Sequence, residues 1–266
     1  MSALLAELCA RPLTEHYVAL FVDGVHVGDQ TIIVSLGVTL AGDKHVLGLW
    51  PGSTENTEVC RSAFSDLADH GLTAEQGLLV VIDGSQALAA AAAATWNGRA
   101  VIQRCQAHKA RNYQEKLPEN KAPRILERVR RAWSQRDAVR AERRLRQIAG
   151  ELEHQGHADA AGSLREGLTE TLTCVRLGLP PALCTSLETT NAIESVFSRH
   201  ENLAHRVKRW RDGQALRWVA TSLTLAEQSF DRLPAAEHLP ALAEALARHV
   251  ARQTEGDGLS DLGATG

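Results

Sequence analysis

Two short apolar runs in this sequence end in the same dipeptide, Asp-Gly. Residues 18–22 are followed by Asp23 and Gly24, and residues 78–82 are followed by Asp83 and Gly84. A short apolar run bounded by turn residues predicts a strand that is buried on both faces of a sheet. One such Asp alone is more often a simple turn residue. Because open α/β sheets place their ligands at the carboxyl ends of strands, the repetition predicts two carboxylates converging on one point.

A third carboxylate, Glu194, lies beside the apolar stripe of a helix predicted from Asn191 to about His205. An alternative reading is open, because Asn191 and Glu194 have the spacing of a capping box. Carboxylates a few Å apart repel unless protons or cations compensate them, and hard oxygen ligands suit Mg²⁺ or Mn²⁺. Two such ions, about 3.5–4 Å apart, would activate the attacking oxygen and stabilise the leaving oxygen of a phosphodiester. Asp23, Asp83 and Glu194 are therefore the candidate catalytic residues and metal ligands.

The elements that must position these carboxylates follow an α/β pattern. The predicted order is three antiparallel strands, a helix, a strand, an Ala-rich helix with Ser85 as its N-cap, and a strand. Their ranges are 18–26, 31–40, 45–50, 55–70, 77–83, 87–94 and 100–103. This is the order of an RNase H-like core, although order alone is an analogy. The fold class predicted is α/β, an RNase H-like mixed sheet with a helical insertion and C-terminal helices.

The segment from residue 104 to 147 is strongly basic, although the whole chain has a formal net charge of only −3. It holds 14 Lys or Arg against 5 Asp or Glu, and Pro118 and Pro123 interrupt it. We expect two or three helices with a basic face between there and residue 173. Such a face can be merely solvated, but its bias toward Arg suits phosphate recognition, because a guanidinium can clasp two phosphate oxygens.

The rest of the chain completes the predicted organisation. Residues 177–190 read as a loop, and two helices, 213–230 and 239–252, close the fold. The predicted parts are a lead-in (1–17), the first part of the core (18–112), a basic helical insertion (113–185), the completed core (186–252) and a disordered tail (253–266). No stretch is apolar enough to span a membrane, and five scattered cysteines favour a reducing cytosol.

Four runs in the sequence carry a family resemblance. They are VIQRCQAHKARN at 101–112, LREGLTETLT at 164–173, TTNAIES at 189–195 and VKRWRD at 207–212. Together they resemble the mutator-type family of bacterial insertion-sequence transposases, over residues 20–230 approximately and in the family's order. Several separate motifs in order are far more specific than a single short pattern.

The resemblance implies an RNase H-like catalytic domain with a DDE triad, in which Asp23, Asp83 and Glu194 hold two Mg²⁺ or Mn²⁺ ions for DNA cleavage and strand transfer. Cys105 and His108 fall on the family's Cys-x-x-His motif. That pair could be half of a zinc site, but there is no second pair at ligand spacing, so we expect His108 to position a carboxylate or a phosphate.

The resemblance also implies DNA, as element ends and target, and a homodimer in the active complex. Neither a membrane nor a small-molecule cofactor is expected, and the location implied is the bacterial cytoplasm, at the nucleoid. Trp133 reads either as helix core or as an aromatic that stacks on a displaced base. The predicted DNA-binding residues are Arg104, Lys109, Arg111, Arg128, Arg130, Arg131, Trp133, Arg206, Lys208, Arg209 and Arg211.

The family's helical N-terminal region, which recognises terminal repeats, finds no counterpart in this sequence. We therefore expect the catalytic domain of a transposase that is short at its N-terminus. Two other functions are considered: a non-catalytic DNA-binding remnant, and an RNase H-like nuclease that hydrolyses DNA without strand transfer.

Overall fold

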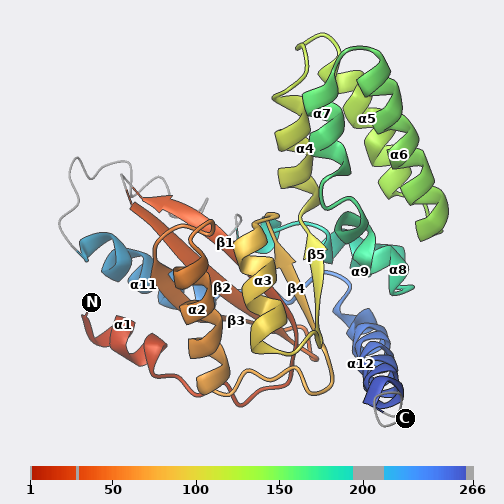
Figure 1. Ribbon diagram of the computed structural model, residues 1–266. Helices are drawn as coiled ribbons and strands as arrows, with labels where there is room; N and C mark the ends of the chain where they lie inside the picture. Colours follow the sequence, from red (N-terminus) through yellow and green to blue (C-terminus); the bar gives the residue numbers. More distant parts are fainter. Residues whose placement is uncertain (1, 28–29, 194–212, 262–266) are drawn as a thin grey trace.

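A single mixed sheet organises the computed structural model, which describes residues 2–27, 30–193 and 213–261, with the backbone alone for 2 and 256–261. The spatial order of its strands is β3-β2-β1-β4-β5 (Figure 1). The strands are β1 (Tyr17–Val27), β2 (Gln30–Thr39), β3 (Lys44–Pro51), β4 (Leu78–Ile82) and β5 (Ala100–Arg104).

The first three strands form an antiparallel meander, and β4 and β5 continue the sheet in parallel with β1. This confirms the predicted mixed α/β sheet, whose strand ranges differ from the observed ones by only a residue or two. The assignment to the RNase H-like fold stays a prediction.

Helices cover both faces of the sheet, as the continuous apolar runs require. Along β1, Val18, Ala19 and Phe21 pack into one core, whereas Leu20 and Val22 pack into the other. Helices α2 (Thr57–Asp69) and α3 (Gln86–Thr95) cover the second core, and α3 is capped by Ser85 as predicted. The first core is covered by α1 (Ser2–Cys9), α9 (Pro181–Leu187), α11 (Gln214–Glu227) and α12 (Leu239–Asp261).

The basic segment folds as a helical insertion that stands beyond the β5 edge of the sheet (Figure 1). Its elements are α4 (Gln106–Gln114), α5 (Ala122–Trp133), α6 (Ala138–His154), α7 (Ala158–Arg165) and the 3₁₀ helix η1 (Thr169–Leu172). These elements share a core of their own, running from Ala110 to Leu172. The helices between β5 and α8 thus share one core, and the insertion bounds of 113–185 stay a prediction.

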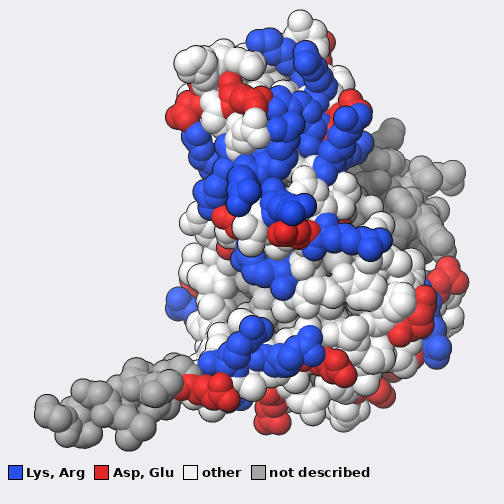
Figure 2. Space-filling model, turned by 90° about the vertical axis from the view of Figure 1, so that its right-hand side faces the viewer, with Lys and Arg blue, Asp and Glu red and all other residues white. Residues whose placement is uncertain are grey.

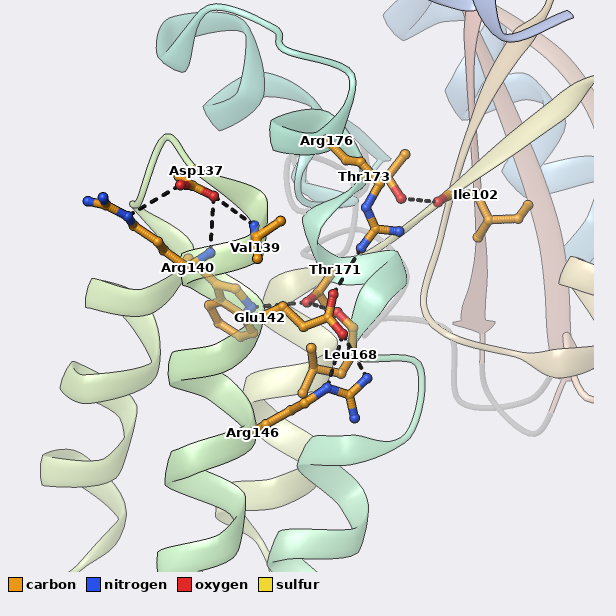
Figure 3. Close-up of polar contacts among 11 residues, drawn as sticks. Ile102, Asp137, Val139, Arg140, Glu142, Arg146, Leu168, Thr171, Thr173 and Arg176 are labelled. Carbon is orange, nitrogen blue, oxygen red and sulfur yellow. Dashed lines mark hydrogen bonds and ion pairs between the residues drawn. The ribbon is translucent and has the colours of Figure 1, made fainter. Parts of the chain in front are cut away.

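Side-chain hydrogen bonds attach the end of the insertion to β5. Thr173, the first residue of α8 (Thr173–Arg176), donates through Oγ1 to the carbonyl of Ile102 at 2.7 Å (Figure 3). The buried Gln103 side chain donates to the Thr171 carbonyl at 3.2 Å and accepts from the Cys174 amide at 3.0 Å. α8 and η1 thus cover the β5 edge of the sheet and pair with the Ile102 carbonyl and the Gln103 side chain.

Two C-terminal regions differ from the sequence prediction. Residues 177–190 contain the helix α9 instead of a continuous loop, because Pro181 lies in its first turn, where a missing amide hydrogen costs nothing. Leu183 and Leu187 on this helix are buried against the sheet. Helix α12 continues to Asp261, so the first part of the predicted disordered tail is helical, and the 3₁₀ helix η2 (Ala236–His238) precedes it. Within the described ranges, no helix combines the length and apolar character needed to cross a membrane.

Candidate active site

Asp23 and Asp83 lie at the same end of two adjacent parallel strands, β1 and β4, in the interior of the sheet. The last parallel pair between β1 and β4 is Val22 with Ile82, so each Asp follows directly after a paired residue. The Asp23 side chain is buried, with 6% of its surface exposed, and Asp83 is partly exposed. The structure therefore brings together the two carboxylates that the repeated Asp-Gly endings predict.

Hydrogen bonds fix the orientation of both carboxylates. The Gly24 amide donates to Oδ1 of Asp23 at 2.9 Å, and the Ser85 amide donates to Oδ1 of Asp83 at 2.8 Å. The Thr54 hydroxyl donates to Oδ2 of Asp83 at 3.3 Å. The described residues fill only part of the roughly four acceptor positions of each carboxylate.

The electrostatic environment of Asp23 shows which groups surround it. Burial raises the pKa of the Asp23 carboxyl, and the negative charge of Asp83 raises it further. The charge of His108 and a hydrogen bond from the Thr190 side chain act in the opposite direction. Two carboxylates, an imidazole and a hydroxyl are therefore close enough to influence one another at this end of the sheet.

Cys105 and His108 form one hydrogen-bonded group with Thr190. Cys105 is the N-cap of α4, and its Sγ accepts from the His108 amide at 3.5 Å and from the Thr190 amide at 3.4 Å. The Thr190 hydroxyl lies 3.3 Å from Nδ1 of His108. Although burial alone would raise it, hydrogen bonds from His108 and Thr190 leave the pKa of Cys105 lowered. The hydrogen bond to Cys105 raises the pKa of His108 against the opposing effect of burial, and Asp23 adds to that rise.

The third predicted ligand, Glu194, lies outside the described residues, as do the predicted DNA contacts Arg206, Lys208, Arg209 and Arg211. Across the ranges that the structure describes, no group of three or more His, Cys, Asp or Glu side chains could hold a metal ion. Two of the three predicted ligands are thus placed together, and the triad itself stays a prediction.

A polar pocket of about 420 Å³ opens beside Asp83. Its lining includes Glu55, Asp83, Ser85, Arg104, His108 and Glu166. These residues come from the turn before α2, the β4–α3 turn, the end of β5, α4 and the segment after α7. The pocket is a site where an anionic and a cationic group could both find partners.

The sequence of this chain matches a known family over most of its length. The profile of the family described as "Transposase, Mutator family" matches residues 2–229. The chain belongs to the Mutator family of transposases. A "Probable transposase for insertion sequence element" from Corynebacterium diphtheriae is 31% identical over 126 residues, which cover 42% of this chain and 36% of that relative. The match thus spans well under two thirds of the relative's length.

Within this Mutator-family chain, three of the predicted DNA contacts are buried instead of displayed on the surface. Arg104 and Lys109 are almost fully buried, and both pair with Glu166, which offsets part of the cost of burying their charges. Trp133 is 6% exposed and its Nε1 donates to the Thr171 hydroxyl at 3.1 Å, as expected for a residue of the helix core. Its ring also borders a pocket of about 480 Å³ between α5 and α9, so stacking on a base stays a prediction.

The remaining predicted contacts on the insertion are accessible. Arg111, Arg130 and Arg131 are exposed, and Arg128 is partly exposed. Figure 2 shows Lys and Arg gathered over the helical insertion, with fewer acidic groups among them. Some of these cations have local partners: Arg146 bonds Glu142, and Arg140 pairs with Asp137, the N-cap of α6 (Figure 3). The face of the insertion seen in Figure 2 is basic, as the composition of the segment predicts.

Sequence reasoning did not identify several residues of the site, among them Thr54, Glu166 and Thr190. Thr190 and Glu166 lie inside two of the runs that carry the family resemblance, so their position was a usable signal. Thr54 stands in a polar turn before α2 and carried no such signal.

Proposed function

We propose that this chain carries the catalytic centre of a DDE transposase on an RNase H-like core, which cleaves DNA and transfers strands with metal assistance. Asp23, Asp83 and Glu194 would be its catalytic residues. The observation that carries the proposal is the parallel register of β1 and β4, in which Asp23 and Asp83 each follow directly after the last paired residue of the two strands. Membership of a transposase family supplies the substrate class, DNA.

The donor set fits Mg²⁺ or Mn²⁺. Asp23 is buried near a second carboxylate, and both effects raise its pKa, so a neighbouring cation would offset the cost of its ionised form. Carboxylate oxygens are the ligands that these hard cations prefer. When two such ions are bound, they supply activation of the attacking oxygen and stabilisation of the leaving oxygen.

The chain's own residues have distinct tasks in this proposal. The Gly24 and Ser85 amides and the Thr54 hydroxyl hold the two carboxylates in fixed orientations. Thr190 joins His108 to Cys105, so His108 is held next to Asp23. Rigid support of this kind keeps a reacting group within the small positional tolerance that catalysis requires.

The accessible cations of the insertion would bind the phosphate backbone without reading sequence. Arg128, Arg130 and Arg131 lie on one helix, and Arg111 lies nearby on α4. Contacts to phosphate position a protein on DNA and make its affinity depend on salt. A homodimer in the active complex, and location at the bacterial nucleoid, remain parts of the same proposal.

Product analysis on labelled DNA tests the proposed function. The chain is incubated with end-labelled duplexes and a supercoiled target in Mg²⁺, and the products are separated on denaturing gels. Joined strands are expected for a transposase, and Asp83→Asn should abolish them. The exposed Asp159→Asn on α7 is the matched control and should leave them unchanged. Nicks without joining would indicate a nuclease, and retardation without any product would indicate a binding module.

A further inference from the structure

Two buried cations share a single carboxylate beside the candidate active site. Arg104 Nη1 lies 2.7 Å from Oε1 of Glu166, and Lys109 Nζ lies 3.1 Å from Oε2 of the same side chain. The Arg104 and Lys109 side chains are 4% and 0% exposed, whereas the Glu166 side chain is 44% exposed. Burial, and secondarily the charge of Arg104, lower the pKa of Lys109 to about 8. Among the described residues, Glu166 is the ion-pair partner of both cations, so the pair carries more positive charge than this one carboxylate neutralises.

The fold builds a specific space for the Arg104 guanidinium. A Cβ on Gly84 would lie 2.2 Å from Nε of Arg104, and a Cβ on Gly167 would lie 2.3 Å from Nη1. Both glycines also have positive φ angles, +117° and +58°, which other residues rarely adopt. Only glycine at both positions allows the guanidinium to lie between these two backbone segments.

Within the described part of the chain, not every nitrogen of this enclosed guanidinium has a hydrogen-bond partner. Its hydrogen bond to the Glu166 carbonyl and its ion pair both come from Nη1. The buried Nε has no hydrogen-bond partner among the described residues. A buried donor without a partner is costly, and such groups are rare in folded proteins.

Arg104 also lines the same pocket as Asp83. Glu55 and Asp83 give that pocket a carboxylate side, and Arg104 with Lys109 behind it gives it a cationic side. The first turn of α3 contributes Ser85 and Gln86 to the lining, and helix N-termini favour anions. Cation-binding carboxylates next to an anion-binding guanidinium would accommodate a metal and a phosphate in one pocket.

We propose that Arg104 binds a backbone phosphate of the DNA strand that lies against Asp83, with Lys109 supporting its charge. In the absence of DNA, Glu166 occupies part of the guanidinium, and its half-exposed carboxylate competes with the phosphate. The inference rests on the proposed function, and it assigns to two buried residues a role at the reaction site that the exposed basic surface of the insertion does not have.

The test measures DNA affinity in a salt series, by fluorescence anisotropy of a labelled duplex with Ca²⁺ present to satisfy the carboxylates. Recovered DNA is run on a gel to confirm that it is intact. Arg104→Gln should weaken binding roughly tenfold or more, because a charge-assisted contact is lost. The slope of log affinity against log salt should fall by about one for the loss of one phosphate contact. Arg104→Lys, which keeps the charge, should be intermediate.

Glu166→Gln separates phosphate binding from a purely structural role, because the two predict effects of opposite sign. If Glu166 competes with phosphate, this variant should bind DNA as tightly as the wild type or more tightly, although it melts at a lower temperature. Arg248→Gln and Glu244→Gln change a solvent-exposed ion pair on α12 and serve as matched controls.

Wild-type affinity and salt slope in both Arg104 variants would overturn the proposal, and so would equal loss of binding in Glu166→Gln and Arg104→Gln. Because Arg104→Gln leaves Glu166 paired with Lys109, we expect it to fold, and circular dichroism checks this. If it does not fold, Arg104→Lys decides alone. The result is separable from the proposed function. If Arg104→Gln binds DNA more weakly but the wild type never cleaves DNA, only the proposed function is contradicted. If the wild type cleaves DNA but the Arg104 variants bind it with unchanged affinity, only the phosphate subsite is contradicted.

Discussion

Asp23 and Asp83 acquire their properties from neighbours that differ between the two positions. Asp23 is buried and interacts with His108, Thr190 and Asp83, so burial and charge oppose one another at that carboxyl. Asp83 is held by a turn amide and by Thr54. A bound cation would satisfy both carboxylates at once, and that gives the first expected outcome.

Mg²⁺ should stabilise the folded chain by relieving the repulsion between these carboxylates. At a Mg²⁺ concentration a hundredfold above Kd, the free energy of unfolding should rise by about 2.7 kcal/mol. For a chain of this size that corresponds to a melting temperature higher by several degrees, at about 2–4 °C per kcal/mol. Asp83→Asn should remove most of the effect, whereas the exposed Asp159→Asn should not. If the melting temperature of the wild type does not change when Mg²⁺ is added, the two carboxylates do not form an assembled metal site.

Glu188 predicts a pH dependence of stability. Burial raises the pKa of its carboxyl from 4.5 to about 7, against an opposing hydrogen bond from Gln106. The folded chain therefore holds this proton more tightly than the unfolded chain. Its contribution to stability is fully present below about pH 4.5 and is lost as the pH rises through 7.

Glu188→Gln should therefore be more stable than the wild type at pH 8, by about 1–3 kcal/mol, and nearly equal to it at pH 4.5. Urea unfolding at both pH values measures the difference. The exposed Glu119→Gln is the control and should show the same small change at each pH. A pH-independent difference for Glu188→Gln would contradict the assignment.

At the element scale, the strands were the most predictable part of the molecule and α9 was the least. Continuous apolar runs marked β1 and β4 because both of their faces are buried, and Asp83-Gly84 marked where β4 stops, whereas β1 continues past Asp23 to Val27. Residues 177–190 lacked such a signal, since Pro180 and Pro181 suggest a loop until the burial of Leu183 is known. Arg104 and Lys109 were recognised as cations, but their partner Glu166 is 57 residues or more away in the chain. Spacing within the sequence does not reveal such pairs.

A bidentate ion pair joins α11 to the N-terminal segment and to β3. Arg11 donates from Nη1 and Nη2 to the two carboxylate oxygens of Glu227 at 2.8 and 2.9 Å, and the Val46 amide donates to Oε1 at 2.8 Å. Glu227→Ala removes the acceptor of the Val46 amide and the charged partner of Arg11, so we expect a loss of about 2–4 kcal/mol in the free energy of unfolding. The exposed Glu237→Ala should change it by less than about 0.5 kcal/mol. Equal effects in urea titrations would show that this contact does not hold α11 in place.

At the scale of the whole molecule, the chain separates its charge by region. The sheet and its covering helices carry the carboxylate pair, and the insertion carries the dense Lys and Arg surface (Figure 2). Composition already indicated this division, because 14 cations and 5 anions fall between residues 104 and 147. The placement of the insertion beyond the β5 edge could not be predicted, since it depends on the contacts of Gln103 and Thr173 with distant residues.

Asp23 and Asp83 are proposed to act together as one metal-dependent site on DNA. The most direct measurement is the single-turnover rate of DNA cleavage in Mg²⁺ for the wild type, Asp23→Asn, Asp83→Asn and the double variant. If the two residues act as a unit, each single variant should lose at least about 10³-fold in rate, and the double variant should lose no more than either. A wild-type rate that is unchanged by removing Mg²⁺, or single variants that cleave as fast as the wild type, would contradict the claim.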